Sequence, residues 1–283
     1  HGGPMHRWPP LSGRQNSRSA PGKWGPLPFP GQPVGKHNLA CLLSHFTPLI
    51  SHLQIDMTSL EQKLTQFDPN ALGDTAGGLY GLPFTPDEAQ VVVVPVPWEV
   101  TVSYRSGTAE APDIIREASL QVDLYDPDLP DAWRMGLAME DIDEAIAAES
   151  RELRPQAESY IGWLEEGSPE GDAAGHSSVV GHINQRGQAL LEWLKAKTGA
   201  LLDAGKGVVV LGGDHSTPLG YLHALAERHE EFGILQIDAH CDLRPAYEGF
   251  EFSHASVMYN ALKLPQVKKL VQVGIRDYCQ QEA

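Results

Sequence analysis

The most distinct feature in the pattern of hydrophobic and polar residues is a pair of short apolar runs, each followed closely by a cluster of Asp and His. The runs are Val208–Leu211 and Ile234–Ile237, and the interval between them, 218–229, has its apolar residues at helical spacing. This alternation predicts a strand, a helix and a second, parallel strand over residues 207–244. Because the carboxyl ends of parallel strands share one edge of a sheet, five polar side chains are expected to meet there. They are Asp214, His215, Asp238, His240 and Asp242.

The rest of the pattern also alternates between strands and helices. Val91–Val94 is uninterrupted and β-branched, as expected for a strand with both faces covered. Lys269–Val273 predicts a further strand, Gln188–Leu202 a helix, and the Gly- and Pro-broken stretch 167–181 an exposed insertion. Short helices are also expected around residues 60–67, after Pro112 and over 257–262. The fold class is therefore α/β.

Composition narrows the class of protein. The chain has 283 residues, of which 41% are apolar, and none of its apolar runs approaches the roughly 20 residues of a membrane helix. A formal charge of −16 argues against a nucleic-acid partner, because phosphate binding relies on basic patches. The three cysteines, Cys41, Cys241 and Cys279, are unclustered, so we expect no disulfide and a reducing compartment. We therefore expect neither a membrane nor a nucleic-acid partner.

Residues 1–56 differ from the remaining chain. They are rich in Pro, Gly and Ser and carry five basic residues but only one acidic residue, Asp56. Such a segment buries too little apolar surface to offset its ordering entropy, so we expect disorder. It is interpreted as a transit peptide, a flexible tail or a stretch foreign to the natural protein, with Met57 as a plausible start. Residues 57–283 are expected to form one domain, located in the cytoplasm unless the segment directs it to an organelle.

The polar residues after the second apolar run suit a metal. Asp238, His240 and Asp242 alternate along an extended segment, so their side chains point the same way. With His215 from the neighbouring strand, they offer carboxylate oxygens and imidazole nitrogens, a set that favours Mn²⁺, with Ni²⁺, Co²⁺ or Fe²⁺ as alternatives. Two such ions about 3.5–4 Å apart would make hydroxide available near neutral pH. The sequence therefore predicts a hydrolase with two divalent metal ions.

Three motifs in this region resemble those of a known family. The segments Gly212–Ser216 (GGDHS), Asp238–Asp242 (DAHCD) and Ser253-His254 are similar to those of the ureohydrolases, the arginase and agmatinase family. The likeness extends over roughly residues 91–276. It implies a three-layer α/β/α fold with a mostly parallel sheet, a two-manganese centre and release of urea from a guanidinium group.

The resemblance also implies a role for each matching residue. His215 would bind one metal, Asp238 would bridge both, His240 would bind the second, and Asp242 would complete the first. His254 would carry a proton to the leaving amine, and Asp214 would support the site. The family commonly forms trimers or hexamers, which implies a homo-oligomer.

One family motif has no counterpart in this sequence. The family takes two further aspartates from a later SxDxDxxDP motif, and the nearest imitation here, Glu140–Asp143, precedes the site. We therefore expect this chain to be a C-terminally truncated ureohydrolase whose own activity is uncertain. Two alternatives remain open, a catalytically inactive binding or interaction module and a deacetylase-like amidohydrolase.

The segment Pro95–Pro112 resembles agmatinase-type members more than animal arginases. The resemblance implies a small cationic guanidino substrate, with agmatine, split to putrescine and urea, as the first expectation. The alternative is free guanidine, hydrolysed to urea and ammonia by a nickel-dependent subgroup. Trp98 and Tyr104 are candidate substrate-binding residues, and a pocket closed by Trp98 would favour guanidine.

Overall fold

The computed structural model describes residues 57–74, 77–169 and 173–283. The predicted disordered segment 1–56 lies outside the described residues. Residues 56–283 form one compact unit. The site and its supports all belong to this unit.

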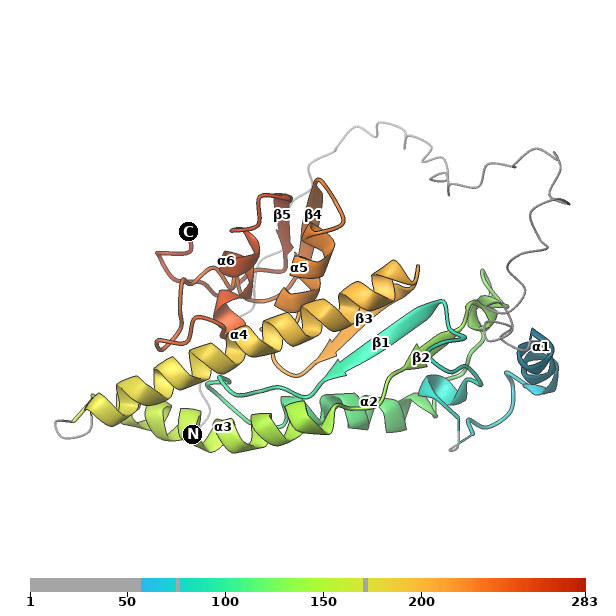
Figure 1. The fold of residues 1–283 in the computed structure, drawn as a ribbon, viewed down its shortest axis with the longest axis horizontal. Coiled ribbons are helices and arrows are strands. Elements are labelled where there is room, and N and C mark those ends of the chain that lie inside the picture. The colour runs from blue at the N-terminus through green and yellow to red at the C-terminus, as the bar shows by residue number, and fades with distance from the viewer. Residues whose placement is uncertain (1–56, 75–76, 170–172) are drawn as a thin grey trace, which may run out of the picture. The chain divides into compact units, whose positions relative to one another are not determined.

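A three-stranded parallel sheet forms the centre of this unit (Figure 1). Its strands are β1 (Val91–Val96), β2 (Leu137–Met139) and β3 (Gly207–Gly212), in the order β2-β1-β3. Five of the six β1 residues are buried, and Val93 packs in a different cluster from Val92 and Val94. The prediction of a strand covered on both faces is therefore confirmed.

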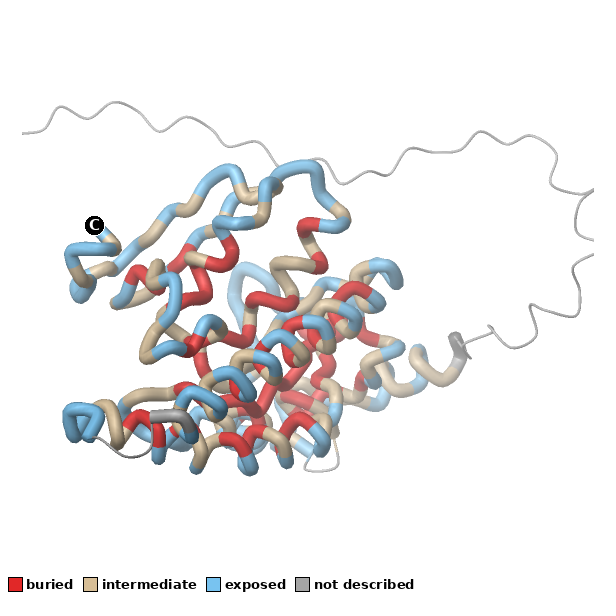
Figure 2. Tube along the Cα trace, turned by 60° about the vertical axis from the view of Figure 1, so that its left-hand side comes forward, coloured by how far each residue is buried: buried red, intermediate tan, exposed pale blue. Residues whose placement is uncertain are grey.

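Two long helices pack against the central strand. They are α3 (Glu144–Glu165) and α4 (Ala173–Asp203). Asp143 begins α3 by accepting hydrogen bonds from the Ala145 and Ile146 amides, as a capping residue does. Leu153 of α3 and Leu194 of α4 join Val94 and Val96 of β1 in one apolar cluster. Figure 2 shows the buried positions gathered in this part of the molecule.

The shorter elements complete the chain. The helices are α1 (Met57–Gln66), α2 (Ala111–Ser119), α5 (Leu219–Ala226) and α6 (Val257–Ala261), with 3₁₀ turns at Leu79–Gly81, Thr108–Glu110, Ala132–Met135 and His254–Ser256. Among the residues that the structure describes, no helix has both the length and the apolar composition needed to cross a bilayer. Parallel strand pairs with covering helices confirm the predicted α/β class.

The predicted insertion at 167–181 is wrong. Residues 173–181 belong to α4, so the helix expected to begin at Gln188 begins at Ala173. Pro155 lies inside α3, and Gly175 and Gly181 lie inside α4. These helix breakers are tolerated because the apolar faces of both helices are buried in the core, and packing outweighs intrinsic propensity.

A second, two-stranded parallel sheet carries the other half of the expected strand–helix–strand unit. It pairs β4 (Phe232–Ile237) with β5 (Val267–Val273), and the structure records no pairing between β3 and β4. The three elements over 207–244 form as predicted, but the two strands belong to different sheets. Leu235, Ile237, Val271 and Val273 leave one face of the second sheet exposed.

We expect truncation of Leu194 to destabilise the protein strongly. Its side chain is fully buried where α4 packs against β1. Leu194→Ala should lower the free energy of unfolding by about 3 kcal/mol, through lost burial and the cavity left behind. Leu72→Ala, at a site that is 98% exposed, should change it by less than about 0.5 kcal/mol. Urea unfolding followed by circular dichroism measures both, and equal losses would contradict the assignment of the core.

Candidate metal centre and substrate cavity

The loop after β3 is positioned by glycine. Gly213 has a φ of +51°, and a Cβ there would lie 2.4 Å from the carbonyl oxygen of Trp98. Only glycine allows the loop to lie this close to the neighbouring segment. The Asp214 amide then donates to the same carbonyl at 2.8 Å. These contacts fix the backbone that presents His215.

The loop after β4 is held by its own backbone and by α6. The Asp238 carboxylate accepts a hydrogen bond from the His240 amide at 2.9 Å. Asp242 has a φ of +54°, which aspartate tolerates better than most residues. Its carbonyl accepts bonds from the amides of Met258 and Tyr259, both at 3.1 Å. The loop is therefore fixed at both ends before any ligand binds.

Gln236 supports this loop from inside the second sheet. It is buried on β4, and its amide nitrogen donates to the His240 carbonyl at 3.1 Å and to Asp238 Oδ2 at 3.3 Å. Gln272 of β5 donates to Gln236 Oε1 at 2.6 Å and to the Cys241 carbonyl at 2.8 Å. Sequence analysis missed both residues. A polar residue within an apolar strand was the available signal.

Three of the four predicted metal ligands converge. His215 Nδ1 lies 2.6 Å from Asp242 Oδ2 and 3.0 Å from Asp238 Oδ2. The ligand atoms of the three residues all lie within 4.8 Å of one another. Asp242 is buried, while His215 and Asp238 are half-buried. One partly enclosed cation site thus forms between loops that follow strands of two different sheets.

The fourth predicted ligand, His240, lies beside this cluster. Its Nδ1 is 3.6 Å from Asp238 Oδ1, and its Nε2 is 3.7 Å from Asp277 Oδ2. The side chain is 58% exposed. Asp277 follows β5, and its amide and that of Arg276 donate to the Ala239 carbonyl. Asp277 lies four residues after the end of β5 and was not among the candidate residues selected from the sequence.

The acidic residues govern protonation in the cluster. Burial would lower the pKa of His215, but its hydrogen bond to Asp242 and the charges of Asp242 and Asp238 outweigh burial and raise that pKa. Burial would raise the pKa of Asp238, but the His240 amide, Gln236 and His215 hold it below its usual range. Burial raises the pKa of Asp214, which Ser216 bonds only partly offset. The two carboxylates therefore favour a positive charge at this position, which a proton on His215 or a bound cation could supply.

The donor set fits a divalent metal ion. Two carboxylates and one imidazole, with Nδ1 facing both carboxylates, match the oxygen and nitrogen ligands that Mn²⁺ and its neighbours take. Burying two carboxylates beside an imidazole costs free energy unless a proton or a cation balances their negative charge. His215, Asp238 and Asp242 could hold one ion, and His240 with Asp238 could contribute to a second.

A cavity of about 610 Å³ opens beside these ligands. Its wall includes His215, His240 and Asp242 of the ligand set, together with Asp214 and His254. It is also lined by residues that sequence analysis did not select: Arg244, Tyr247, Asp277, Tyr278 and Glu282. All five lie between four and ten residues after the end of β4 or β5, and no spacing pattern distinguishes them from ordinary loop residues.

The structure separates the two predicted substrate-binding residues. Tyr104 lines the cavity, and its side chain is 82% exposed. Trp98 is 2% exposed, packs in the core with Val94 and Val96, and does not line this cavity. The cause is local. The turn after β1 directs the Trp98 ring inward, while its carbonyl faces the Gly213 loop.

His254 and Asp214 retain unused hydrogen-bonding capacity. Asp214 Oδ1 accepts bonds from the Ser216 amide at 2.8 Å and its hydroxyl at 2.5 Å, but the buried Oδ2 has no partner. The buried His254 Nδ1 also has none, and its ring meets the edge of Tyr247 at 5.8 Å. Both residues line the cavity. Unsatisfied buried polar atoms of this kind mark a functional site.

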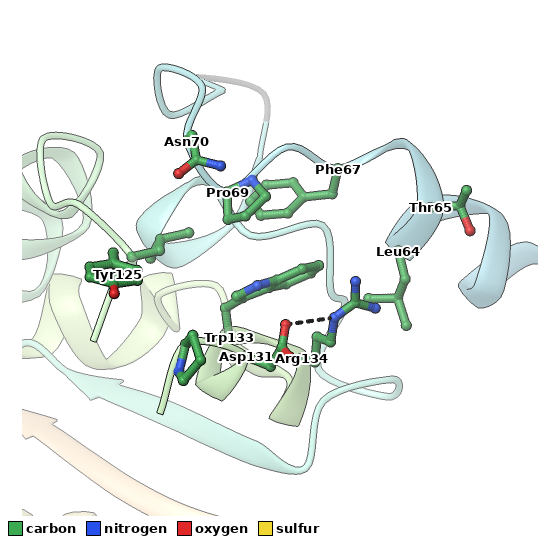
Figure 3. Close-up of a pocket in the computed structure, with 11 residues that line it drawn as sticks. Leu64, Thr65, Phe67, Pro69, Asn70, Tyr125, Asp131, Trp133 and Arg134 are labelled. Atoms are coloured by element: carbon green, nitrogen blue, oxygen red, sulfur yellow. Dashed lines mark hydrogen bonds and ion pairs between the residues drawn. The ribbon is translucent and has the colours of Figure 1, made fainter. Parts of the chain in front are cut away.

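A second cavity, of about 520 Å³, lies between α1 and the Ala132–Met135 turn (Figure 3). Phe67 and Trp133 form its apolar wall, with ring centroids 4.9 Å apart. Its charged residues satisfy each other, since Arg134 lies 3.3 Å from Asp131 and 4.6 Å from the Trp133 ring centroid. No converging ligand set faces it among the described residues. The metal cluster therefore identifies the other cavity as the candidate active site.

Curated relatives match the larger part of the described chain. The N(1)-aminopropylagmatine ureohydrolase of Synechocystis sp. is 30% identical over 197 residues, covering 69% of this chain and 54% of the relative. That of Thermus thermophilus is 31% identical over 199 residues, covering 70% and 55%. The agmatinase of Bacillus anthracis is 29% identical over 196 residues, covering 69% and 55%. The chain thus spans about 55% of the length of these relatives.

One solved structure shares the fold at low sequence identity. Trypanosoma cruzi formiminoglutamase, solved with Mn²⁺, superposes with a TM-score of 0.51 at 16% identity, covering 72% of this chain and 60% of that one. The arginase family model matches residues 89–283, which include every residue of the metal cluster and the cavity wall. The chain therefore belongs to the arginase family.

Proposed function

We propose that the protein is a ureohydrolase, which hydrolyses a guanidinium C–N bond with divalent metal ions and releases urea. The observation that carries this proposal is the convergence of His215, Asp238 and Asp242 within 4.8 Å at a cavity that also contains His254. Membership of the arginase family and the names of the relatives support it. We propose Mn²⁺ as the metal, with Ni²⁺ as the alternative.

The substrate we propose has an aliphatic cationic arm. Agmatine would be split to putrescine and urea, and the longer N(1)-aminopropylagmatine named by two relatives has the same reacting group. The cavity of about 610 Å³ exceeds what guanidine needs, and Trp98, the bulky group expected to close it, lies in the core. Both observations favour an arm-bearing substrate over free guanidine.

Each residue of the site has a distinct task in this reaction. His215, Asp238, Asp242 and His240 would hold the metal ions, which supply Lewis acidity and lower the pKa of a water molecule. Their carboxylates also give the wall a negative field that favours a guanidinium over a neutral group. Water adds its oxygen to the guanidinium carbon, the bond from that carbon to the arm nitrogen breaks, and urea and the amine result.

His254 would supply the proton that the departing amine needs. Its Nδ1 is buried without a partner at the cavity, where it can hold or move a proton. Asp214 and His254 interact electrostatically, and a positive charge on His254 would oppose the burial that raises the pKa of Asp214. This assigns proton transfer to His254 and its electrostatic support to Asp214.

A binding module without activity is the second candidate function. It is favoured by one observation, that the described residues supply only three ligand atoms within 4.8 Å of one another. Metal analysis separates the two functions. Tightly bound metal with turnover supports the hydrolase, whereas a chain that binds neither metal nor a guanidino compound supports the module.

Substitutions in the cluster should separate metal binding from proton transfer. Asp238→Asn should abolish both metal binding and urea release, because it removes a charged oxygen from the ligand set. His254→Ala should leave the metal content intact and lower kcat by about 100-fold, the contribution typical of a positioned acid. Asp131→Asn, an exposed aspartate at the other cavity, is the control. Urea release and metal content are measured for each, and full turnover by Asp238→Asn would contradict the proposal.

Metal affinity should depend on pH through His215. Its raised pKa means that a proton must leave before the ring can bind a cation. The apparent affinity for Mn²⁺ should therefore fall as pH falls, by about tenfold per pH unit below that pKa for one displaced proton. Calorimetry at pH 8 and pH 5.5, in buffers of different ionisation enthalpy, measures affinity and proton release. Equal affinity at the two pH values without proton release would contradict this role.

Substrate selection should follow the size of the cavity. We expect urea release to be fastest with agmatine or N(1)-aminopropylagmatine and much slower with guanidine, which leaves most of the cavity unfilled. A urea assay over these compounds and arginine measures the order. Guanidine as the best substrate would overturn the proposed arm-bearing class and leave the ureohydrolase assignment in place.

A further inference from the structure

The segment between β1 and α2 forms one wall of the candidate active-site cavity. The residues of this wall that line the cavity are Val102, Ser103, Tyr104 and Thr108. Before the Thr108–Glu110 turn this wall has no helix or strand to hold it, and several of its residues are exposed. A wall of this kind needs specific contacts to offset its conformational entropy.

The Glu99 side chain supplies such contacts. Its Oε2 accepts three hydrogen bonds, from the Gly107 amide at 2.7 Å, the Thr108 hydroxyl at 3.0 Å and the Ala109 amide at 3.1 Å. Glu99 is buried, and the described residues give it no ion pair. A buried carboxylate is costly unless strong donors meet it, and here all three donors belong to the far end of the wall. The carboxylate therefore closes the segment 99–109 into a loop.

The same loop contacts the backbone that presents the metal ligand His215. The Gly213 amide donates to the Thr108 carbonyl at 3.2 Å, and the Asp214 amide donates to the Trp98 carbonyl at 2.8 Å. The Glu99 side chain binds Thr108, and Trp98 is the residue immediately before Glu99. Glu99 thus connects Trp98 and Thr108, the two residues whose carbonyls bind the amides of the Gly213–His215 turn. A shift of the wall would change the position of His215 relative to the substrate.

Helix α3 fixes Glu99 itself. The Glu99 amide contacts the buried Ser150 Oγ at 3.2 Å. Arg154, one turn further along α3, donates to the Val100 and Val102 carbonyls and, at 3.0 Å, to Ser106 Oγ. The carboxylate therefore binds the loop from a rigid base. Glu99 is not among the residues that line the cavity, so its contacts to the loop are the route by which it reaches the site.

We propose that Glu99 is a positioning residue for the hydrolysis described above: it holds the 102–109 wall against the Gly213–His215 turn and so sets the affinity for the substrate. The proposal rests on the proposed function for its kinetic effect but not for its structural effect. Glu99 acts through Thr108 and Gly213, and the reacting atoms contact neither its carboxylate nor its backbone.

Hydrogen exchange at single amides tests the structural part. Glu99→Ala should accelerate exchange at Gly107, Ala109 and Gly213 by at least about tenfold, because charge-assisted bonds are lost. Glu99→Gln keeps an acceptor oxygen, so its acceleration should be smaller. Glu149→Gln is the matched control, since it removes a carboxylate of α3 that binds Arg186 of α4, away from the wall. Unchanged exchange at these three amides in both Glu99 variants, or equal acceleration in the control, would overturn the proposal.

Kinetics test the functional part. In an active preparation, Glu99→Gln should raise KM for agmatine by about tenfold while kcat and the metal content change less than about twofold, a split that general destabilisation does not produce. A fall in kcat at constant KM would overturn the assignment to the cavity wall. If the unmodified protein releases no urea, the proposed function fails, and the exchange measurement alone still decides the role of Glu99.

Discussion

The contact between His215 and Asp242 is the interaction on which the site depends. The two residues follow strands of different sheets, and their ring nitrogen and carboxylate oxygen lie 2.6 Å apart. No strand pairing connects these loops, so the packing of helices must bring them together. An apolar cluster does so, because Leu191 of α4, Leu219 of α5 and Val257 of α6 pack with Ile234 and Leu270 of the second sheet. The chemistry of the site thus depends on a helix-mediated arrangement of two sheets.

Several features of the fold could be predicted because local physics decides them. The β-branched run at Val91 is a strand with both faces covered. The alternation of Asp238, His240 and Asp242 was less informative, because Asp242 has a φ of +54° and His240 lies beside the cluster that Asp238 and Asp242 form with His215. Other features depend on tertiary packing. Helix α4 extends across Gly175 and Gly181 because its other face is buried, and β3 and β4 separate because their pairing is decided by partners distant in sequence. The spacing of apolar residues along the sequence reveals neither feature.

The same distinction explains what was missed in the site. Trp98 follows a strand end, as pocket residues do, but the turn after β1 directs its ring into the core and its carbonyl toward Gly213. Glu99, its neighbour in sequence, lies outside the cavity and determines the shape of the cavity wall. Side-chain direction at a turn depends on the backbone dihedral angles, and composition does not reveal them. The convergence of His215, Asp238 and Asp242 could therefore be predicted, whereas the residues that position them could not.

The charge balance of the cavity connects this arrangement with the substrate class. Four carboxylate side chains line the cavity, whereas Arg244 is the one arginine or lysine among the described lining residues. The four are Asp214, Asp242, Asp277 and Glu282. Glu282 is already used, because Arg244 lies 3.5 Å from it and the Leu243 and Cys279 amides donate to it. Among the described residues, the other three carboxylates contact only histidine rings and neutral donors. Metal cations and the guanidinium of the proposed substrate would neutralise their negative charge better, which supports the proposal of a cationic substrate.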